Sequence, residues 1–145
     1  MAGISNYLKD QVLNGYFRDT AMTSPTNVYV ALYSTMPNDA GTGGTELSGT
    51  GYARVAIPTT NAAWDAPAAG SGTVRFIQNA AAVDFGTAGS DWAPSGTPAV
   101  GFGLWDASSS GNYLGGSLFL SSKIIQSGDP VKFNAGSLDV QIQGS

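Results

Sequence analysis

Histidine and cysteine are both absent from the 145 residues, and charged side chains are scarce. Without an imidazole or a thiol, the chain has no histidine general acid or base, no cysteine nucleophile, no disulfide and no imidazole or thiolate metal ligand. Charged residues make up 11% of the sequence, less than half of the usual share of about 25%. The surface must therefore be built largely from glycine, serine, threonine, asparagine and glutamine.

Positive charge is especially limited, because six lysines and arginines stand against ten acidic residues and give a net charge of -4. Binding to a phosphate backbone needs clustered basic residues, so we expect no nucleic-acid partner. No window approaches about 18 consecutive apolar residues, so we expect neither a membrane span nor a membrane partner. The N-terminus has no basic run followed by an apolar stretch, so we expect no signal peptide and synthesis in a reducing cytoplasm.

One segment has the spacing of a helix. Between Ser5 and Phe17 the apolar residues recur every three to five positions, which predicts a helix over about residues 5–17. Ser5 is a suitable N-cap, because its hydroxyl can accept a backbone N–H of the first turn. The turn-forming cluster at residues 23–27 then ends the helical region.

From residue 27 onward the apolar period becomes two, which is typical of strands. We predict strands near residues 28–33, 53–57, 74–77, 83–85, 100–105, 118–120, 131–133 and 138–143. The chain is thus predicted to be one mainly β domain over residues 1–145, with a β-region at about 27–143. The expected fold is an antiparallel β-sandwich or tulip-like barrel with one short N-terminal α-helix and long loops.

Turn-rich segments separate the predicted strands. Residues 106–112 read as a hairpin loop and residues 127–130 as a second turn. The connections at residues 34–51 and 60–72 are longer, and loops of that length are usually functional or become ordered by a partner.

Three motifs resemble ligand or catalytic sites but fail in detail. Residues 106–111 start like a calcium loop, but Ser117 stands where the bidentate glutamate belongs, so a hairpin turn is favoured. The glycine-rich residues 41–46 lack the lysine and hydroxyl residue of a phosphate-binding loop. Glu46 is the only glutamate, and no spacing pairs it with an aspartate as a glycosidase requires. We therefore predict no catalytic residue, no cofactor, no metal and no enzyme activity.

Residues for contact with a partner can still be named. Trp64 and Trp92 lie in predicted loops, and aromatic residues are common at contact centres as well as in cores. Arg54 either pairs with an acidic residue, reaches a partner carboxylate or lies with its stem over apolar surface. The candidate interface residues are Tyr7, Tyr16, Met36, Tyr52, Arg54, Trp64 and Trp92.

The long loop and the strand after it carry a specific string, since residues 31–57 read ALYSTMPNDAGTGGTELSGTGYARVAI. The string resembles the hallmark of a family of small virion proteins of tailed bacteriophages, in which A-L-x-T-x-x-P leads into D-A-G-T-G-x-E-x-S-G-x-G-Y-A-R. An opening helix, a glycine-spaced strand at 100–106, a G-x-L segment at 116–118 with Lys123 and a turn at 127–130 follow the family's order. The chain departs from the pattern at residues 33–35 and in extra length between residues 64 and 98.

Members of that family are often labelled tail fibre proteins, and similar members are capsid decoration, or cement, proteins with a tulip-like β-domain. The resemblance implies a virion structural protein without enzyme activity, made in the cytoplasm of the bacterial host. We expect a decoration protein on the outside of the head that binds the major capsid protein and forms homo-oligomers, taken as trimers. The alternative is a tail or baseplate component, or an adhesin associated with a tail fibre.

Overall fold

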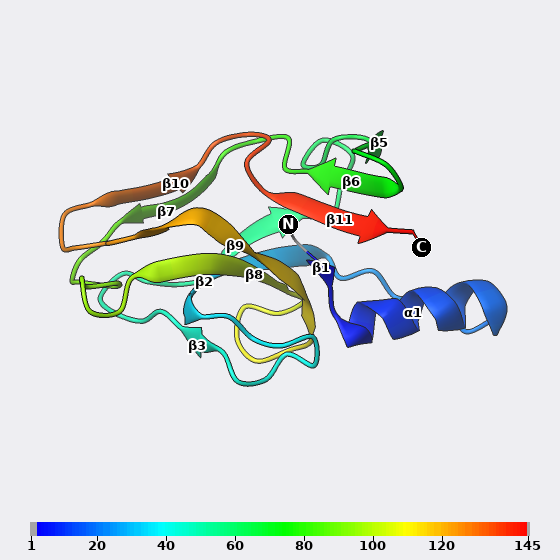
Figure 1. Ribbon diagram of the computed structural model, residues 1–145, viewed down its shortest axis with the longest axis horizontal. Coiled ribbons are helices and arrows are strands. Elements are labelled where there is room, and N and C mark those ends of the chain that lie inside the picture. Colours follow the sequence, from blue (N-terminus) through cyan, green and yellow to red (C-terminus); the bar gives the residue numbers. More distant parts are fainter. Residues whose placement is uncertain (1–2, 145) are drawn as a thin grey trace.

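The computed structural model describes residues 3–144, and its strands form two facing layers (Figure 1). The larger layer is a six-stranded antiparallel sheet in the order β1-β9-β8-β2-β3, with β4 pairing with the other half of β2. Its strands are β1 (Gly3–Ile4), β2 (Asn27–Thr35), β3 (Thr45–Glu46), β4 (Val55–Pro58), β8 (Ala99–Trp105) and β9 (Tyr113–Lys123).

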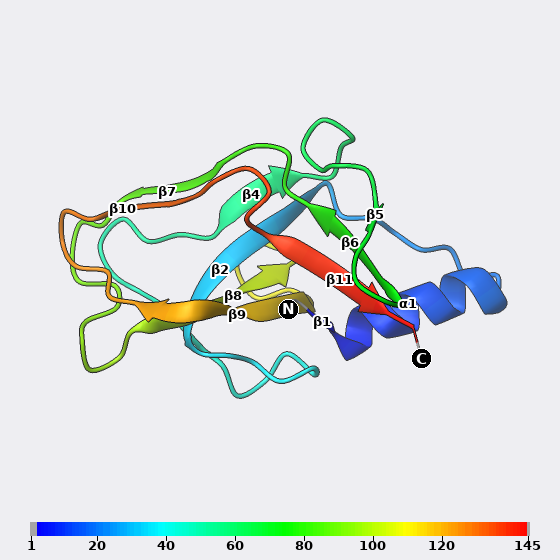
Figure 2. The same cartoon turned by 45° about the horizontal axis from the view of Figure 1, so that its top comes forward.

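The smaller layer consists of two short antiparallel sheets that lie over the main sheet (Figure 2). In one, β7 (Val83–Thr87) pairs with β10 (Pro130–Phe133). In the other, β6 (Val74–Gln78) lies between β5 (Ala68–Ala69) and β11 (Asp139–Gln143). The layers form a sandwich-like fold, as predicted. They do not close into the tulip-like barrel, because within residues 3–144 the outer edge of β9 has no strand partner beyond Gly116.

The core lies between the two layers. Leu32 of β2 and Phe102 of β8 are buried on the inner face of the main sheet, and Phe85 and Leu138 are buried from the other side. Phe133 of β10 joins the layers, since its ring lies 6.0 Å from that of Phe102 and 6.1 Å from that of Phe85. Each large apolar side chain that is buried in this way contributes about 1.5–3 kcal/mol, so the layers are held mainly by side-chain packing.

Helix α1 (Asn6–Phe17) begins where the sequence predicts it. The Ser5 hydroxyl accepts the N–H of Leu8 as an N-cap, and it donates to the carbonyl of Tyr113 at the start of β9. Tyr7 and Leu8 pack against the core, but none of the helix residues is fully buried. The helix therefore leaves the sandwich from one fixed end, and its far end projects past the sheets (Figure 1).

All eight predicted strands are present, with one large difference in length. The apolar pattern predicts a strand only at residues 118–120, but β9 begins at Tyr113, because Gly115 and Gly116 interrupt the pattern without interrupting the strand. The two-residue strands β1, β3 and β5 were not predicted, since they are too short to show a period.

The predicted hairpin at residues 106–112 is confirmed. The two oxygens of the Asp106 carboxylate accept the backbone and side-chain N–H groups of Asn112, each at 2.7 Å. Ser110 and Gly111 turn the chain with positive φ angles of 53° and 83°. The carboxylate that resembled the start of a calcium loop is thus used to close the turn.

On the outer face of the main sheet, the glycines of β8 and β9 allow another segment of the chain to pack directly against the strands. A side-chain Cβ at Gly101 would overlap the carbonyl oxygen of Ser117, and it would lie 2.7 Å from the sulfur of Met36. A Cβ at Gly116 would lie 2.9 Å from the terminal methyl of the same methionine. The segment that contains Met36 can therefore lie directly on the sheet only while these positions stay glycine.

We predict that Gly101→Ala lowers the free energy of unfolding by about 2 kcal/mol or more, because the added methyl group overlaps backbone that cannot move independently. Urea unfolding followed by tryptophan fluorescence measures this change. Gly96→Ala is the matched control, since a Cβ there meets no atom within 4 Å. Equal unfolding midpoints for the two variants would contradict the close packing at Gly101.

Candidate functional site

Both faces of the main sheet are covered along β2. Leu32 points into the core, while Ala31 and Tyr33 face the opposite side and are also buried. The long connection after β2 provides this outer cover, with Met36 over the glycines of β8 and β9 and Arg54 over the ring of Trp105. The sequence predicts that this connection is functional or becomes ordered by a partner, and in the structure it packs on its own chain.

A partly buried ion pair between Arg54 and Glu46 holds the loop over the sheet. Nε of Arg54 donates to both carboxylate oxygens of Glu46 at 3.0 and 3.2 Å, and Nη2 donates to Oε2 at 2.8 Å. Nη1 donates to the carbonyl oxygens of Ala107 and Ser110 at 3.1 and 2.9 Å. The guanidinium carbon lies 4.4 Å from the ring centroid of Trp105. One side chain thereby joins the long loop to the hairpin between β8 and β9.

Two tyrosines extend this polar cluster into the sheet. The Tyr52 hydroxyl donates to Oε1 of Glu46 at 3.1 Å and accepts the backbone N–H of Leu32 at 2.9 Å. The hydroxyl of Tyr33 accepts the indole N–H of Trp105 at 2.8 Å. Burial, with the negative charge of Glu46 adding to it, raises the pKa of Tyr33 to about 12, and burial raises the pKa of Tyr52 further still.

The cluster offers no free group for chemistry. Both oxygens of Glu46 already accept hydrogen bonds, and every buried side-chain polar atom in residues 3–144 has a partner. In the same part of the chain, no three acidic side chains come together in a way that could hold a metal ion. The arrangement fits a structural clamp that fastens two loops to the sheet.

The seven predicted interface residues do not form one surface. Trp92 is 3% exposed and donates its indole N–H to the carbonyl of Thr50 at 3.0 Å, while its ring lies edge-on to Tyr52 at 5.4 Å. The structure thus brings Tyr52, Arg54 and Trp92 to the same region, but it uses their surfaces within the chain. Each of these three residues was predicted at a partner contact. Their packing within the chain leaves little side-chain surface for such a contact.

The remaining four candidates lie apart from this cluster. Trp64 is half-buried and forms an isolated β-bridge with Asn79. Trp64 and Tyr7 of the helix both pack against the core. Met36 is half-buried over the glycines of the sheet. Tyr16 is the one clearly exposed residue of the seven, at 77%.

Large exposed apolar side chains gather at two places, of whose exposed residues the sequence analysis named only Tyr16. The first is the far end of α1 and the segment after it. We call it the helix-tip patch, and it consists of Leu13, Tyr16, Phe17 and Met22. Three of these stand at positions i, i+3 and i+4 of the helix and so share one face. Phe17 is 81% exposed.

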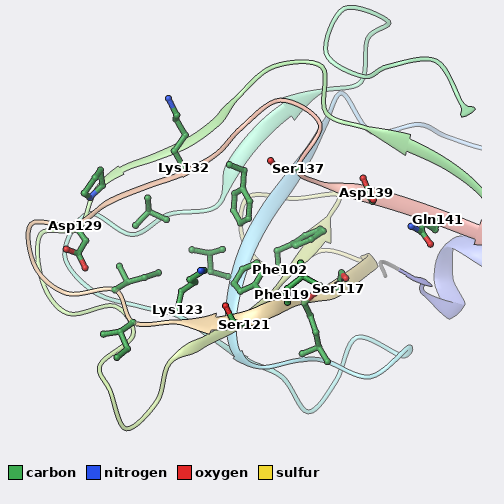
Figure 3. Close-up of a pocket in the computed structure, with 18 residues that line it drawn as sticks. Phe102, Ser117, Phe119, Ser121, Lys123, Asp129, Lys132, Ser137, Asp139 and Gln141 are labelled. Carbon is green, nitrogen blue, oxygen red and sulfur yellow. Dashed lines mark hydrogen bonds between the residues drawn. The ribbon is translucent and has the colours of Figure 1, made fainter. Parts of the chain in front are cut away.

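The second place is a groove of about 870 Å³ between the free end of β9 and the strands of the smaller layer (Figure 3). We call it the β9 groove. Phe102, Phe119 and Phe133 form its floor, and Leu118, Leu120 and Ile124 stand exposed along it. The run of apolar residues on both faces of β9 at 118–120 was a signal that could have identified it, since a half-buried strand should alternate.

A family model for the podophage GP4 fiber I protein gp80 matches residues 3–141. The chain belongs to this phage family. The match covers the clamp, the helix and the groove, and it agrees with the family of small phage virion proteins that the sequence resembles. No curated protein matches the chain. Membership in this family makes the chain a structural protein of a bacteriophage virion.

One further finding concerns membranes. In the part of the chain that the structure describes, no helix has the length and apolar character needed to cross a bilayer.

We predict that Arg54→Ala lowers the free energy of unfolding by about 2 kcal/mol, because it removes the charged partner of Glu46, which keeps only the Tyr52 hydroxyl as a donor, and it removes the donor of two carbonyl oxygens. Arg75→Ala is the matched control, since that exposed side chain makes one hydrogen bond to the carbonyl of Pro67, and its loss should cost about 0.5 kcal/mol or less. Urea denaturation measures both. Similar losses in the two variants would show that the clamp adds no stability.

We also predict a loss of stability in alkaline solution. The pKa of Tyr33 and that of Tyr113 are each raised to about 12 by burial, whereas a tyrosine in the unfolded chain has a pKa of about 10. Between these values only the unfolded chain releases the protons, so the stability that is fully present below about pH 10 falls as the pH rises toward 12.

Each of these tyrosines contributes a slope of up to about 1.4 kcal/mol per pH unit. Urea unfolding at a series of alkaline pH values measures the slope for the natural chain and for Tyr33→Phe. The variant should lose stability less steeply with pH. The same slope in both proteins would mean that the proton on Tyr33 is not held by the fold.

Proposed function

We propose that this virion protein is a decoration protein of the phage head, bound to the outside of the capsid through apolar contacts and without enzyme activity. The observation that carries the proposal is the gathering of exposed apolar side chains in the helix-tip patch and the β9 groove. Large contiguous apolar patches on a folded protein mark contacts with other proteins. Charged residues make up only 11% of the sequence, whereas the surface of a protein that stays dispersed on its own is typically about 25–35% charged.

The polar groups support a binding role in place of catalysis. Glu46, the one glutamate, is held by Arg54 and Tyr52 on the outer face of the sheet, so it is not free to transfer a proton to a substrate. The clamp makes the loops rigid, and a rigid surface loses less entropy when it is ordered against a partner.

The proposed partners are the major capsid protein and further copies of this chain, with the trimer as the expected oligomer. Binding to the assembled shell and not to its separate subunits stabilises the shell by mass action. Several linked copies bind more tightly than one, because each contact raises the local concentration of the next. With six basic residues and a net charge of -4, the chain has no clustered charge for the packaged DNA, and we propose no nucleic-acid or membrane partner. Synthesis takes place in the bacterial host cytoplasm.

A fibre role is the second candidate, and the matched family description favours it because it names a fiber protein. In that case the same apolar surfaces would join the chain to other fibre, tail or baseplate subunits, or would support an adhesin. The two candidates differ in the number of copies per particle and in their place on it.

We predict hundreds of copies per particle, distributed over the head, in the phage that encodes this chain. Quantitative gel analysis of purified virions measures the number, and antibody labelling in the electron microscope gives the place. Particles that lack the chain should release DNA at a lower temperature than complete particles, because the shell loses its stabilising partner.

The control for the heating experiment is the same deficient particle after addition of the purified protein, which should regain the higher release temperature. A handful of copies confined to the tail or to fibres would overturn the head location and support the fibre role. Unchanged DNA release after loss of the protein would contradict a cement function.

A further inference from the structure

We propose that copies of this chain assemble by exchanging their N-terminal arm, which comprises β1 and α1 at residues 3–17. In such an assembly the arm of one copy binds the sandwich of the next copy, through the same contacts that the structure shows within a single chain. This inference rests on the self-association in the proposed function, and it names the segment that carries it.

The arm is fastened to the sandwich only near its start. β1 pairs with β9, the backbone N–H of Ser5 donates to the carbonyl of Leu114 at 2.9 Å, and Lys9 forms an ion pair with Asp39 at 2.8 Å. The partners of the arm all belong to the sandwich and come later in the chain. The site that receives an arm is therefore complete on each copy, and an arm from a second copy can form every one of these contacts.

The rest of the arm and the segment after it are not tied to the sandwich. Within residues 3–144, residues 10–24 form no hydrogen bond and no ion pair with any strand or with the loops between the strands. Residues 16–24 are exposed without interruption. This segment connects the arm to β2, but nothing in its contacts fixes which copy the arm binds.

One residue turns the chain back after the helix. Asp19 has a positive φ of 51°, a left-handed conformation that is unfavourable for a residue with a side chain. The turn brings Met22 against Gly15, where an added Cβ would lie 3.4 Å from the Cβ of Met22. The chain then runs back from the helix end to β2 (Figure 2). Rotation of Asp19 to an ordinary φ would relieve the turn and direct the arm away from its own sandwich.

The connection is long enough to join two copies. Residues 18–26 link α1 to β2, and when extended they span up to about 30 Å. The helix, with 12 residues, is only about 18 Å long. An opened arm can thus be carried past its own sandwich to a neighbour while β2 keeps its place in the sheet.

The helix-tip patch favours the exchanged form. Leu13, Tyr16 and Phe17 lie before the turn and Met22 lies after it, and all four are at least 47% exposed in the single copy. When copies exchange arms, these connecting segments are the part of the chain that passes between the sandwiches. The patches can then pack together, and the burial of their apolar surface offsets the entropy lost on association.

Arm exchange determines which assemblies can form. Two copies that exchange arms with each other form a dimer, whereas copies that each pass an arm to the next form a closed ring. The trimer proposed above is one such ring. In every case each copy gives one arm and receives one.

The ion pair of Lys9 with Asp39 shows which copy an arm binds. A carbodiimide joins this ammonium and this carboxylate into an amide, and the reagent takes up the released water as a urea. Unlabelled and isotope-labelled chains are unfolded, refolded together, cross-linked and digested, and mass spectrometry identifies the joined peptides. We expect peptides that carry Lys9 from one isotope and Asp39 from the other, together with covalent oligomers on a denaturing gel.

Two lysine variants control for unspecific cross-links. Lys9→Gln should remove the mixed-isotope peptides, because it removes the amine that reacts. Lys123→Gln should keep them, because Lys123 lies at the far end of β9 and has no contact with the arm.

The turn at Asp19 provides a second, independent test. Asp19→Gly adopts the positive φ freely, so it should shift the equilibrium toward the closed monomer by about fivefold. Asp19→Pro fixes φ near about −65° and excludes the turn, so it should shift the equilibrium toward assemblies. Ser110→Gly is the matched control, since Ser110 also has a positive φ, at 53°, but forms no hydrogen bond with the arm. Sedimentation equilibrium measures all three variants against the natural chain.

Two results would overturn the proposal. One is a natural chain whose Lys9–Asp39 cross-links join only residues of the same isotope, whether the protein is monomeric or assembled. The other is an equal degree of assembly for Asp19→Gly and Asp19→Pro.

These outcomes can be told apart from a failure of the proposed function. Assemblies whose cross-links all lie within single copies would leave the proposed oligomer standing and overturn only the exchange of arms. Mixed-isotope cross-links in a protein that is absent from the phage head would contradict the decoration role and leave the exchange standing.

Discussion

The pairing of Arg54 with Glu46 is the contact on which the outer cover of the main sheet depends. Removing two charges from water is costly, and such a pair is favourable only when its remaining donors and acceptors are also satisfied. Here the guanidinium reaches two further carbonyl oxygens, and Tyr52 donates to the carboxylate. The pair therefore fixes the relative position of a long loop, a hairpin and the strand between them. Without it, the loop would lose its polar contacts with the hairpin, and the ring of Trp105 would lose the guanidinium that lies over it.

Beside its apolar core, the molecule pairs its buried polar groups but leaves several large apolar side chains exposed. Buried polar atoms in the described residues are all paired, whereas several large apolar side chains are more than half exposed. A stable monomer usually exposes little contiguous apolar surface, because such surface promotes association. The fold thus resembles a subunit whose final burial occurs in an assembly, which agrees with its membership in a family of virion proteins.

Local sequence patterns predicted the helix and the strands, but they did not predict which loops pack over the sheet. The spacing of residues 5–17 and the Ser5 cap located α1, and the period of two located eight strands, because these patterns arise within a few residues. The role of Arg54 depends on Glu46 eight residues away and on a hairpin more than fifty residues away, and no local pattern encodes that distance. For the same reason Trp92 in a predicted loop proved to be a core residue, and the continuous apolar run of β9 gave no indication of which face stays open.

Within residues 3–144 the outer edge of β9 has no strand partner beyond Gly116, which is a reason for another element to cover it. A free strand edge next to apolar side chains is a template for uncontrolled strand pairing, and proteins usually protect it with charge or with a covering element. Lys123 at the end of β9 gives partial protection, but Leu118 and Leu120 remain exposed before it. A strand from a neighbour would extend the sheet and present a new free edge, so the problem would pass to the next copy. A helix satisfies its own backbone hydrogen bonds, and it covers the apolar side chains without offering another edge.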